Sequence, residues 1–163
     1  DFASADVVRA FRVINDGVMG GVSTSRLAAV GEGMRFEGEV SLENNGGFAS
    51  VRSSPVRENL NGTDAFVFRV RGDGRRYKFT VRTGSGFNAP NYQAELMTKR
   101  GEWEELRLAL KDFVPMFRGR VLNDVPPLNL AKVTSLGFLI SDKQEGAFKL
   151  EMAWIKASAP TGQ

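Results

Sequence analysis

The chain has 163 residues, of which 42% are hydrophobic and 25% are charged, and these proportions are typical of one globular domain. It contains no Cys and no His, which excludes disulfides, cysteine nucleophiles, metal sites built on Cys or His, and Ser-His-Asp catalysis. The formal charge of +3 is spread along the chain without a run of like charges, so we expect no nucleic-acid partner. The apolar stretches are too short to cross a bilayer, and we expect no membrane-spanning segment.

The first feature is a glycine-rich loop that follows a short apolar run, Phe11 to Ile14. It reads Asn15-Asp16-Gly17-Val18-Met19-Gly20-Gly21-Val22-Ser23. Alternation over residues 34–42 then predicts a half-buried strand. A second loop of the same character follows, Asn44-Asn45-Gly46-Gly47-Phe48-Ala49-Ser50-Val51-Arg52, and its last residues, 48–52, form a shorter strand candidate.

Later alternating runs predict further strands at 65–71, 76–83, 92–98, 103–110, 133–140 and 147–156. The turn Gly72-Asp73-Gly74 predicts that the first two of these runs form a hairpin. Residues 142–146 predict a hairpin turn between the last two runs. Trp154 and Tyr77 are placed on apolar faces. The segment from Lys111 to Lys132 has no period, and we expect one long irregular connection there.

About eight or nine antiparallel strands with regular turn signals indicate an all-β sandwich or barrel. We expect residues 1–163 to form a single domain, with a frayed tail at 158–163. The chain does not begin with Met, so localisation stays open between a bacterial cytoplasm or periplasm and a mitochondrial matrix.

Four stretches carry a resemblance to a known family. They are the two glycine-rich loops, Phe113-Val114-Pro115-Met116-Phe117-Arg118-Gly119-Arg120, and residues 137–148, which read GFLISDKQEGAF. They lie in order along the chain, which resembles the complex I intermediate-associated protein family. The resemblance implies a jelly-roll β-sandwich of the galactose-binding-like type. It also implies a non-catalytic role in assembling respiratory NADH dehydrogenase, with protein partners that include subunits of that complex. The shortness of the chain suits a bacterial member.

The two glycine-rich loops are candidates for one ligand site, to which Asn15, Asp16, Asn44 and Asn45 contribute. The competing interpretation is that these side chains bond the backbone of tight turns. No loop has the acidic spacing of a calcium site, and we expect neither a metal nor a cofactor.

Three arginines lie opposite the apolar faces of their strands, Arg52, Arg82 and Arg107, and Trp103 shares the last of these faces. Such a face suits a sugar or an anionic peptide, whereas cross-strand ion pairing explains it without a ligand. We favour ion pairing for most of them. Arg52 is the best exception because it directly follows the second loop, and Arg82 is the next.

Two further segments supply candidates. Under the resemblance, Asp142 and Gln144 of the 142–146 turn are able to reach a polar ligand. In the long connection, Phe117, Arg118 and Arg120 form a candidate protein contact, since arginines pair well with carboxylates.

Three functions compete. A non-catalytic binding domain for complex assembly leads, a carbohydrate-binding module that recognises a sugar or glycan is the alternative, and a carboxylate-dependent hydrolase is the weakest. The hydrolase would need a carboxylate pair such as Asp16 with Asp142 or Glu105, and almost any chain offers such pairs.

Overall fold

The computed structural model describes residues 11–15, 23–30, 33–43, 47–53, 60, 62–83, 91–117, 120–123, 125, 127–141 and 144–158. Twelve strands lie within these ranges. They are β1 (Phe11–Asn15), β2 (Thr24–Val30), β3 (Gly33–Val40), β4 (Ala49–Ser53), β5 (Ala65–Arg71), β6 (Arg76–Thr83), β7 (Asn91–Met97), β8 (Trp103–Ala109), β9 (Val114–Phe117), β10 (Arg120–Val121), β11 (Val133–Ile140) and β12 (Gly146–Ser158). Two single 3-10 turns, Leu110–Asp112 and Leu130–Lys132, also lie within these ranges.

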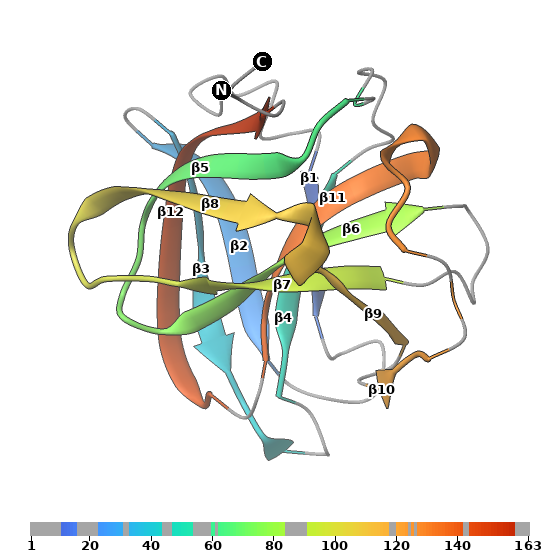
Figure 1. The fold of residues 1–163 in the computed structure, drawn as a ribbon. Coiled ribbons are helices and arrows are strands. Elements are labelled where there is room, and N and C mark those ends of the chain that lie inside the picture. The colour runs from blue at the N-terminus through green and yellow to red at the C-terminus, as the bar shows by residue number, and fades with distance from the viewer. Residues whose placement is uncertain are drawn as a thin grey trace.

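The strands form two antiparallel sheets that pack face to face (Figure 1). The seven-stranded sheet has the order β1-β4-β11-β6-β7-β9-β10, and the five-stranded sheet has the order β2-β3-β12-β5-β8. Each sheet has one apolar face, and a sandwich buries both of these faces against each other. The all-β sandwich class predicted from the sequence is therefore confirmed.

The core is rich in aromatic side chains contributed by both sheets. Phe68 of β5 and Phe79 of β6 meet edge to face, with ring centroids 4.7 Å apart, and Phe138 of β11 packs against both. Tyr77 of β6 and three residues of β7, Tyr92, Ala94 and Leu96, are also buried. The period-2 alternation read from the sequence thus identifies the inner faces of most strands.

The predicted hairpin between 65–71 and 76–83 is wrong. Strand β5 pairs with β12 and β8 in one sheet, whereas β6 pairs with β11 and β7 in the other. Gly74, with φ of +87°, belongs to a connection that crosses between the sheets. An alternating pattern with a glycine turn fits a hairpin and a connection between two sheets equally well, because the pattern does not specify which strand is the partner.

The predicted hairpin at 142–146 is wrong for the same reason, since β11 and β12 lie in different sheets. The segment 111–132 is more regular than expected, because β9 and β10 pair within it. Strand β2 was not predicted. Trp154 is not on the apolar face, because a register shift between Met152 and Trp154 pairs it with the outward Arg69.

Candidate functional site

Three sequence segments singled out above have their ends at one end of the sandwich. Asn15, the last residue of β1, pairs with Ala49, the first of β4, and Ala49 also pairs with Ile140 at the end of β11. In the other sheet Gly146 at the start of β12 pairs with Val40 at the end of β3. The described strand ends that flank segments 16–22, 44–46 and 142–143 therefore lie at one end of the sandwich, and each of these segments belongs to a connection between strands of different sheets.

Ser23 fastens the end of the first loop to the start of the second. Its hydroxyl accepts a hydrogen bond from the Ser41 amide at 2.9 Å and donates one to the Ser41 carbonyl at 3.3 Å. A buried serine whose hydroxyl both accepts from and donates to a neighbouring backbone holds the two segments together. Ser23 therefore has a structural role where the first loop ends.

Several candidate groups lie outside the described residues, so the loop site stays a prediction. These groups are Asp16, Asn44, Asn45, Asp142 and Arg118, together with the side chains of Asn15, Phe117 and Arg120.

Gln144 is engaged by the backbone of β6. Its side-chain amide donates to the Arg76 carbonyl at 2.8 Å and to the Ser141 carbonyl at 2.9 Å, and its oxygen accepts from the Arg76 amide at 3.1 Å. Arg75 adds a bond to the Gln144 carbonyl at 2.9 Å. This side chain therefore joins Ser141 and Gln144 to the backbone of β6, which is a structural role for a residue predicted to meet a ligand.

Asp73 is a residue whose importance the sequence did not reveal. Its carboxylate accepts hydrogen bonds from the Tyr77 hydroxyl at 3.0 Å, from the Arg75 amide at 3.1 Å and from the Lys149 amide of β12 at 2.8 Å. Burial, and then the charge of Asp73, hold the pKa of Tyr77 well above its usual value. The only sequence signal was an Asp between two glycines, which predicts a turn and nothing more.

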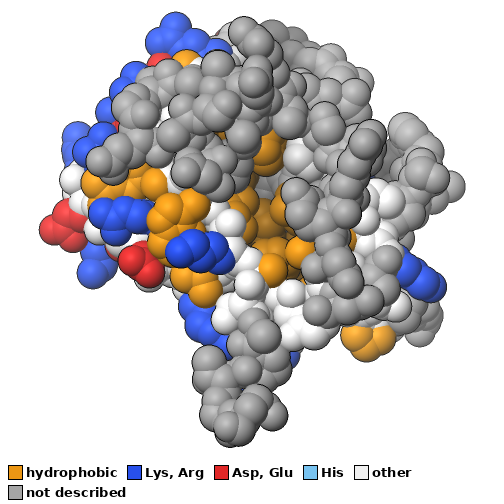
Figure 2. Space-filling view, turned by 90° about the horizontal axis from the view of Figure 1, so that it is seen from above, with side chains coloured by type: hydrophobic (Ala, Val, Ile, Leu, Met, Phe, Trp, Pro, Cys, Tyr) orange, Lys and Arg blue, Asp and Glu red, His pale blue; other side chains and the backbone are white. Residues whose placement is uncertain are grey.

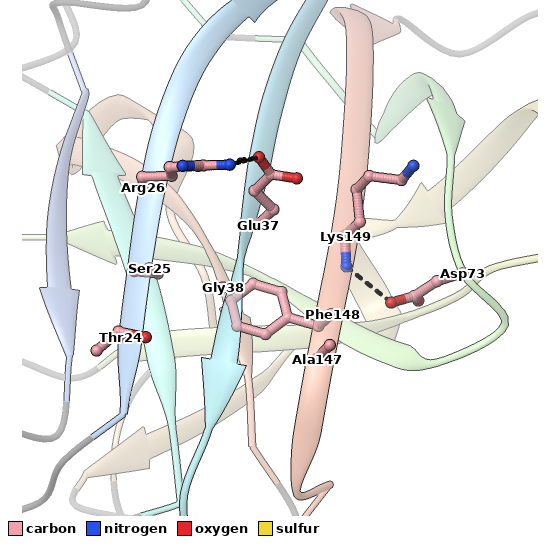
Figure 3. A pocket seen from close by; sticks show the side chains of 9 residues that line it. All are labelled: Thr24, Ser25, Arg26, Glu37, Gly38, Asp73, Ala147, Phe148 and Lys149. Carbon is pink, nitrogen blue, oxygen red and sulfur yellow. Dashed lines mark hydrogen bonds and ion pairs between the residues drawn. The ribbon is translucent and has the colours of Figure 1, made fainter.

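An open groove of about 540 Å³ lies across β2, β3 and β12 (Figure 3). Its walls include Ser25, Gly38 and Phe148, and a Cβ added to Gly38 would lie 2.0 Å from the Thr24 carbonyl oxygen. In Figure 3 Arg26 bonds Glu37 at 2.7 Å, and the backbone amide of Lys149 donates to the Asp73 carboxylate. The Lys149 ammonium takes part in neither contact.

We call the outer face of the five-stranded sheet the paired face, because its arginines pair with carboxylates at 2.7 to 3.9 Å. The pairs are Arg26–Glu37, Arg35–Glu151, Arg69–Glu105, Arg71–Glu151 and Arg107–Asp64. At its centre Glu151 is only 5% exposed. Basic and acidic side chains are intermixed along the side of the molecule where β3 and β12 lie (Figures 1 and 2).

Trp103 belongs to this paired face, and its ring is covered by two cations. The guanidinium carbons of Arg71 and Arg69 lie 4.9 and 5.5 Å from its ring centroid. On the same face the Lys156 ammonium lies 4.2 Å from the ring of Trp154. Cation–π contacts of this kind stabilise the face without a ligand.

We call the outer face of the seven-stranded sheet the basic face. Pairing across β4, β11, β6 and β7 places its described members side by side: Arg52 opposite Gly137, Gly137 opposite Thr80, Ser135 opposite Arg82, Arg82 opposite Asn91, and Lys78 opposite Glu95. Arg52 and Arg82, the two arginines favoured for ligand binding, therefore share one face. Arg107 lies on the opposite side of the molecule.

Arg82 has an unusual environment on this face. Burial and the neighbouring positive charge of Arg52 lower the pKa of Arg82 to about 10. Within the described part of the chain, Arg82 forms no ion pair. Arg82 therefore shares the basic face with a second arginine whose charge disfavours its own.

Other observations limit the chemistry. Within the described ranges no three Asp or Glu side chains gather as metal ligands would. None of the helical elements described is long and apolar enough to span a membrane.

Comparison with known proteins assigns the family. The sequence profile of Complex I intermediate-associated protein 30 (CIA30) matches residues 1–152. The chain belongs to this family. A *Drosophila melanogaster* protein named Complex I intermediate-associated protein 30, mitochondrial, is 27% identical over 95% of this chain, and a *Neurospora crassa* protein of the same name is 30% identical over 74%. The chain spans 60% and 50% of the lengths of these CIA30 relatives.

Solved structures share the fold of this CIA30 family member. The family 11 carbohydrate-binding module of a *Clostridium thermocellum* cellulase superposes with a TM-score of 0.67 at 11% identity, over 94% of this chain and 91% of the module. The agarase AgWH50C superposes with a TM-score of 0.67 at 12% identity, over all of this chain and 24% of the enzyme. At such identities the likeness shows the sandwich fold alone.

Proposed function

We propose that this domain is a non-catalytic protein-binding module that assists the assembly of a respiratory NADH dehydrogenase. The observation that carries the proposal is the family match, which covers residues 1–152. The absence of Cys and His from the sequence supports a non-catalytic role, because the commonest nucleophile–base pairs are unavailable. Its partners are protein subunits or assembly intermediates of the respiratory complex.

Affinity purification tests this function. The full chain is tagged, expressed in its native source and recovered from membranes in a mild detergent. A matched control carries the same tag on the family 11 carbohydrate-binding module, which has the same fold. We expect NADH dehydrogenase subunits to be enriched with this chain and not with the control. Equal recovery from both proteins would contradict the proposal.

A carbohydrate-binding function is the second candidate, and one observation favours it. The Asn91 side-chain oxygen is buried on the basic face without a hydrogen-bond partner, as an acceptor awaiting a hydroxyl group would be. Against it, both tryptophans lie on the paired face under cations, so the described basic face offers no tryptophan for sugar stacking. Thermal shift with a β-1,3-1,4-mixed-linked tetrasaccharide separates the two functions, and a stabilisation that saturates would favour the sugar.

A further inference from the structure

We propose that β8 receives an extended segment of a protein partner, which adds to the five-stranded sheet as a further antiparallel strand. This inference rests on the proposed function, because it gives the geometry by which a protein-binding module would hold its partner. An added strand gains affinity from main-chain hydrogen bonds and specificity from its alternate side chains.

The first argument is the open edge of β8, by which we mean its side away from β5. Strand β8 is the last in the order of the five-stranded sheet, and the described structure contains no backbone hydrogen bond on that side of it. It pairs with β5 over all seven residues without a register shift, and neither Pro nor Gly interrupts it. Bulges, prolines and short length protect sheet edges from further pairing, and β8 has none of them.

The second argument is which backbone groups point to the open edge. The Leu110 amide donates to the Asp64 carbonyl at 2.9 Å, and this bond continues the register between β5 and β8. Hydrogen-bonded pairs alternate along an antiparallel ladder, so the even-numbered residues of β8 bond β5. The N–H and C=O groups of Trp103, Glu105 and Arg107 therefore point away from β5. They have the spacing that an incoming antiparallel strand requires.

The third argument is the apolar surface that an added strand would cover. Leu106 and Leu108 pack against the core but are only half-buried. Their partners in β5, Phe68 and Phe66, are at most 1% exposed. The leucines stay partly exposed because they have a neighbouring strand on one side and not on the other. Covering them with apolar side chains of a partner would remove this surface from water and favour binding.

The fourth argument concerns the seven-stranded sheet, which favours a single segment over a second copy of the chain. Strand β8 contacts β7, and β9 and β10 continue the seven-stranded sheet beyond β7 (Figure 1). Pro115 of β9 pairs with the buried Tyr92, so it belongs to the inner face, yet it is only half-buried. A single added strand would lie over this surface. Two copies that met through β8 would instead bring their β9 and β10 strands against each other.

The side chains of β8 specify the chemistry of the added segment. On the paired face, the side chains of Glu105 and Arg107 are 58% and 54% exposed, so each has room for a second partner. An antiparallel segment would place a base opposite Glu105 and an acid opposite Arg107, with apolar side chains between them to cover the leucines. Because the two charges have opposite signs, they select a segment with this order of charges over other strands.

A nuclear magnetic resonance titration tests the proposal. The probe is the heptapeptide Thr-Val-Glu-Val-Lys-Val-Thr with blocked ends, added to the isotope-labelled full chain. We expect saturable shifts of the Glu105 and Arg107 amide signals and slower hydrogen exchange at both. The amides of Leu106 and Leu108, which already bond β5, should change much less. Failure of the probe to bind at millimolar concentration would overturn the proposal.

Two N-methylated forms of the probe test the hydrogen bonds themselves. Methyl groups on its Glu and Lys nitrogens block the N–H groups that would face β8, and we expect binding to weaken by about tenfold or more. Methyl groups on two valine nitrogens block N–H groups that would face away, so we expect a loss of less than about threefold. Equal losses for both forms would show binding without strand addition and would overturn the proposal.

Two substitutions carry the same test to the protein. Glu105→Pro and Glu105→Thr both remove the carboxylate, and only the proline also removes an N–H group that points to the open edge. We expect Glu105→Pro to weaken binding of the probe by about tenfold or more and Glu105→Thr by less than about threefold. If Glu105→Pro does not fold, the methylated probes still decide. A wild-type chain that sediments as a dimer, and as a monomer after Glu105→Pro, would assign the edge to a second copy and overturn the proposal.

The purification experiment is repeated with both variants to separate this inference from the proposed function. Recovery of subunits by the wild type and Glu105→Thr, and not by Glu105→Pro, supports both. Equal recovery by all three overturns the docking site and leaves the function standing. If the wild type recovers no subunits, the function fails, and the heptapeptide titration still decides the inference.

Discussion

The two outer faces of the sandwich place their arginines in different surroundings. On the paired face, Glu151 lies between Arg71 and Arg35, at 3.0 and 3.8 Å, and the Arg71 guanidinium also lies 4.9 Å from the Trp103 ring centroid. On the basic face, burial and then the positive charge of Arg52 lower the pKa of Arg82. The difference teaches that a count of arginines says little about binding, because what matters is whether the fold supplies their counter-charges.

The largest expected effect is at the centre of the paired face. Glu151→Gln would leave Arg35 and Arg71 adjacent without their shared carboxylate, at a cost of about 2–3 kcal/mol in unfolding free energy. Urea unfolding followed by tryptophan fluorescence measures this loss. The control Glu105→Gln breaks an exposed pair with Arg69 and should cost less than about 0.5 kcal/mol. Similar losses for both would mean that the face is not organised around Glu151.

The connection between the two sheets provides the next test. Asp73→Ala removes an acceptor from the Tyr77 hydroxyl and from two backbone amides, and we expect it to cost about 2 kcal/mol. The same urea experiment applies. Asp64→Ala is the matched control, since its carboxylate bonds only the exposed Arg107 in the described structure. A stability of Asp73→Ala equal to that of the control would show that water replaces these bonds.

The raised pKa of Tyr77 predicts that the stability of the protein falls at high pH. Its pKa in the folded protein lies above the value of about 10 expected for the unfolded chain, so the folded state holds this proton more tightly. The stability gained is complete below pH 10 and is lost as pH rises further, at about 1.4 kcal/mol per pH unit.

Urea unfolding of the wild type and of Tyr77→Phe between pH 9 and 11 checks this effect. The unfolding free energy of the variant should depend less on pH than that of the wild type. Tyr92→Phe is the control, because burial also raises the pKa of Tyr92 but no carboxylate adds to it. Parallel curves for wild type and Tyr77→Phe would contradict the assignment.

The smallest expected effect follows from removing Arg82 from the basic face, which should stabilise the protein rather than destabilise it. Because the pKa of Arg82 is lower in the folded state than in the unfolded chain, its charge destabilises the protein below pH 10. Arg82→Gln should therefore raise stability at neutral pH by up to about 1 kcal/mol, after allowance for screening by solvent. Arg69→Gln on the paired face should not. A loss on removing Arg82 would mean that its charge is compensated after all.

The candidate site could be predicted in part. Position on the outward face of a strand followed from alternation, so Arg52, Arg82 and Trp103 were placed on polar faces from sequence. Their grouping could not be predicted, because it depends on which strands are neighbours. Gln144 was predicted to meet a ligand, and no sequence pattern revealed that its amide bonds the backbone of β6, 68 residues earlier in the chain.

The sequence by itself determined the inner and outer faces of most strands and the all-β class, because side-chain alternation is a local property of extended backbone. It also determined what catalysis is excluded, since no fold supplies a missing Cys or His. Only the tertiary structure decided that β5 and β6 belong to different sheets and that Trp154 faces outward at a bulge. It also decided that Arg82 and Arg52 share one outer face while Arg71 lies beside Glu151 on the other. Pairing between strands distant in sequence sets these neighbours, and no local pattern encodes it.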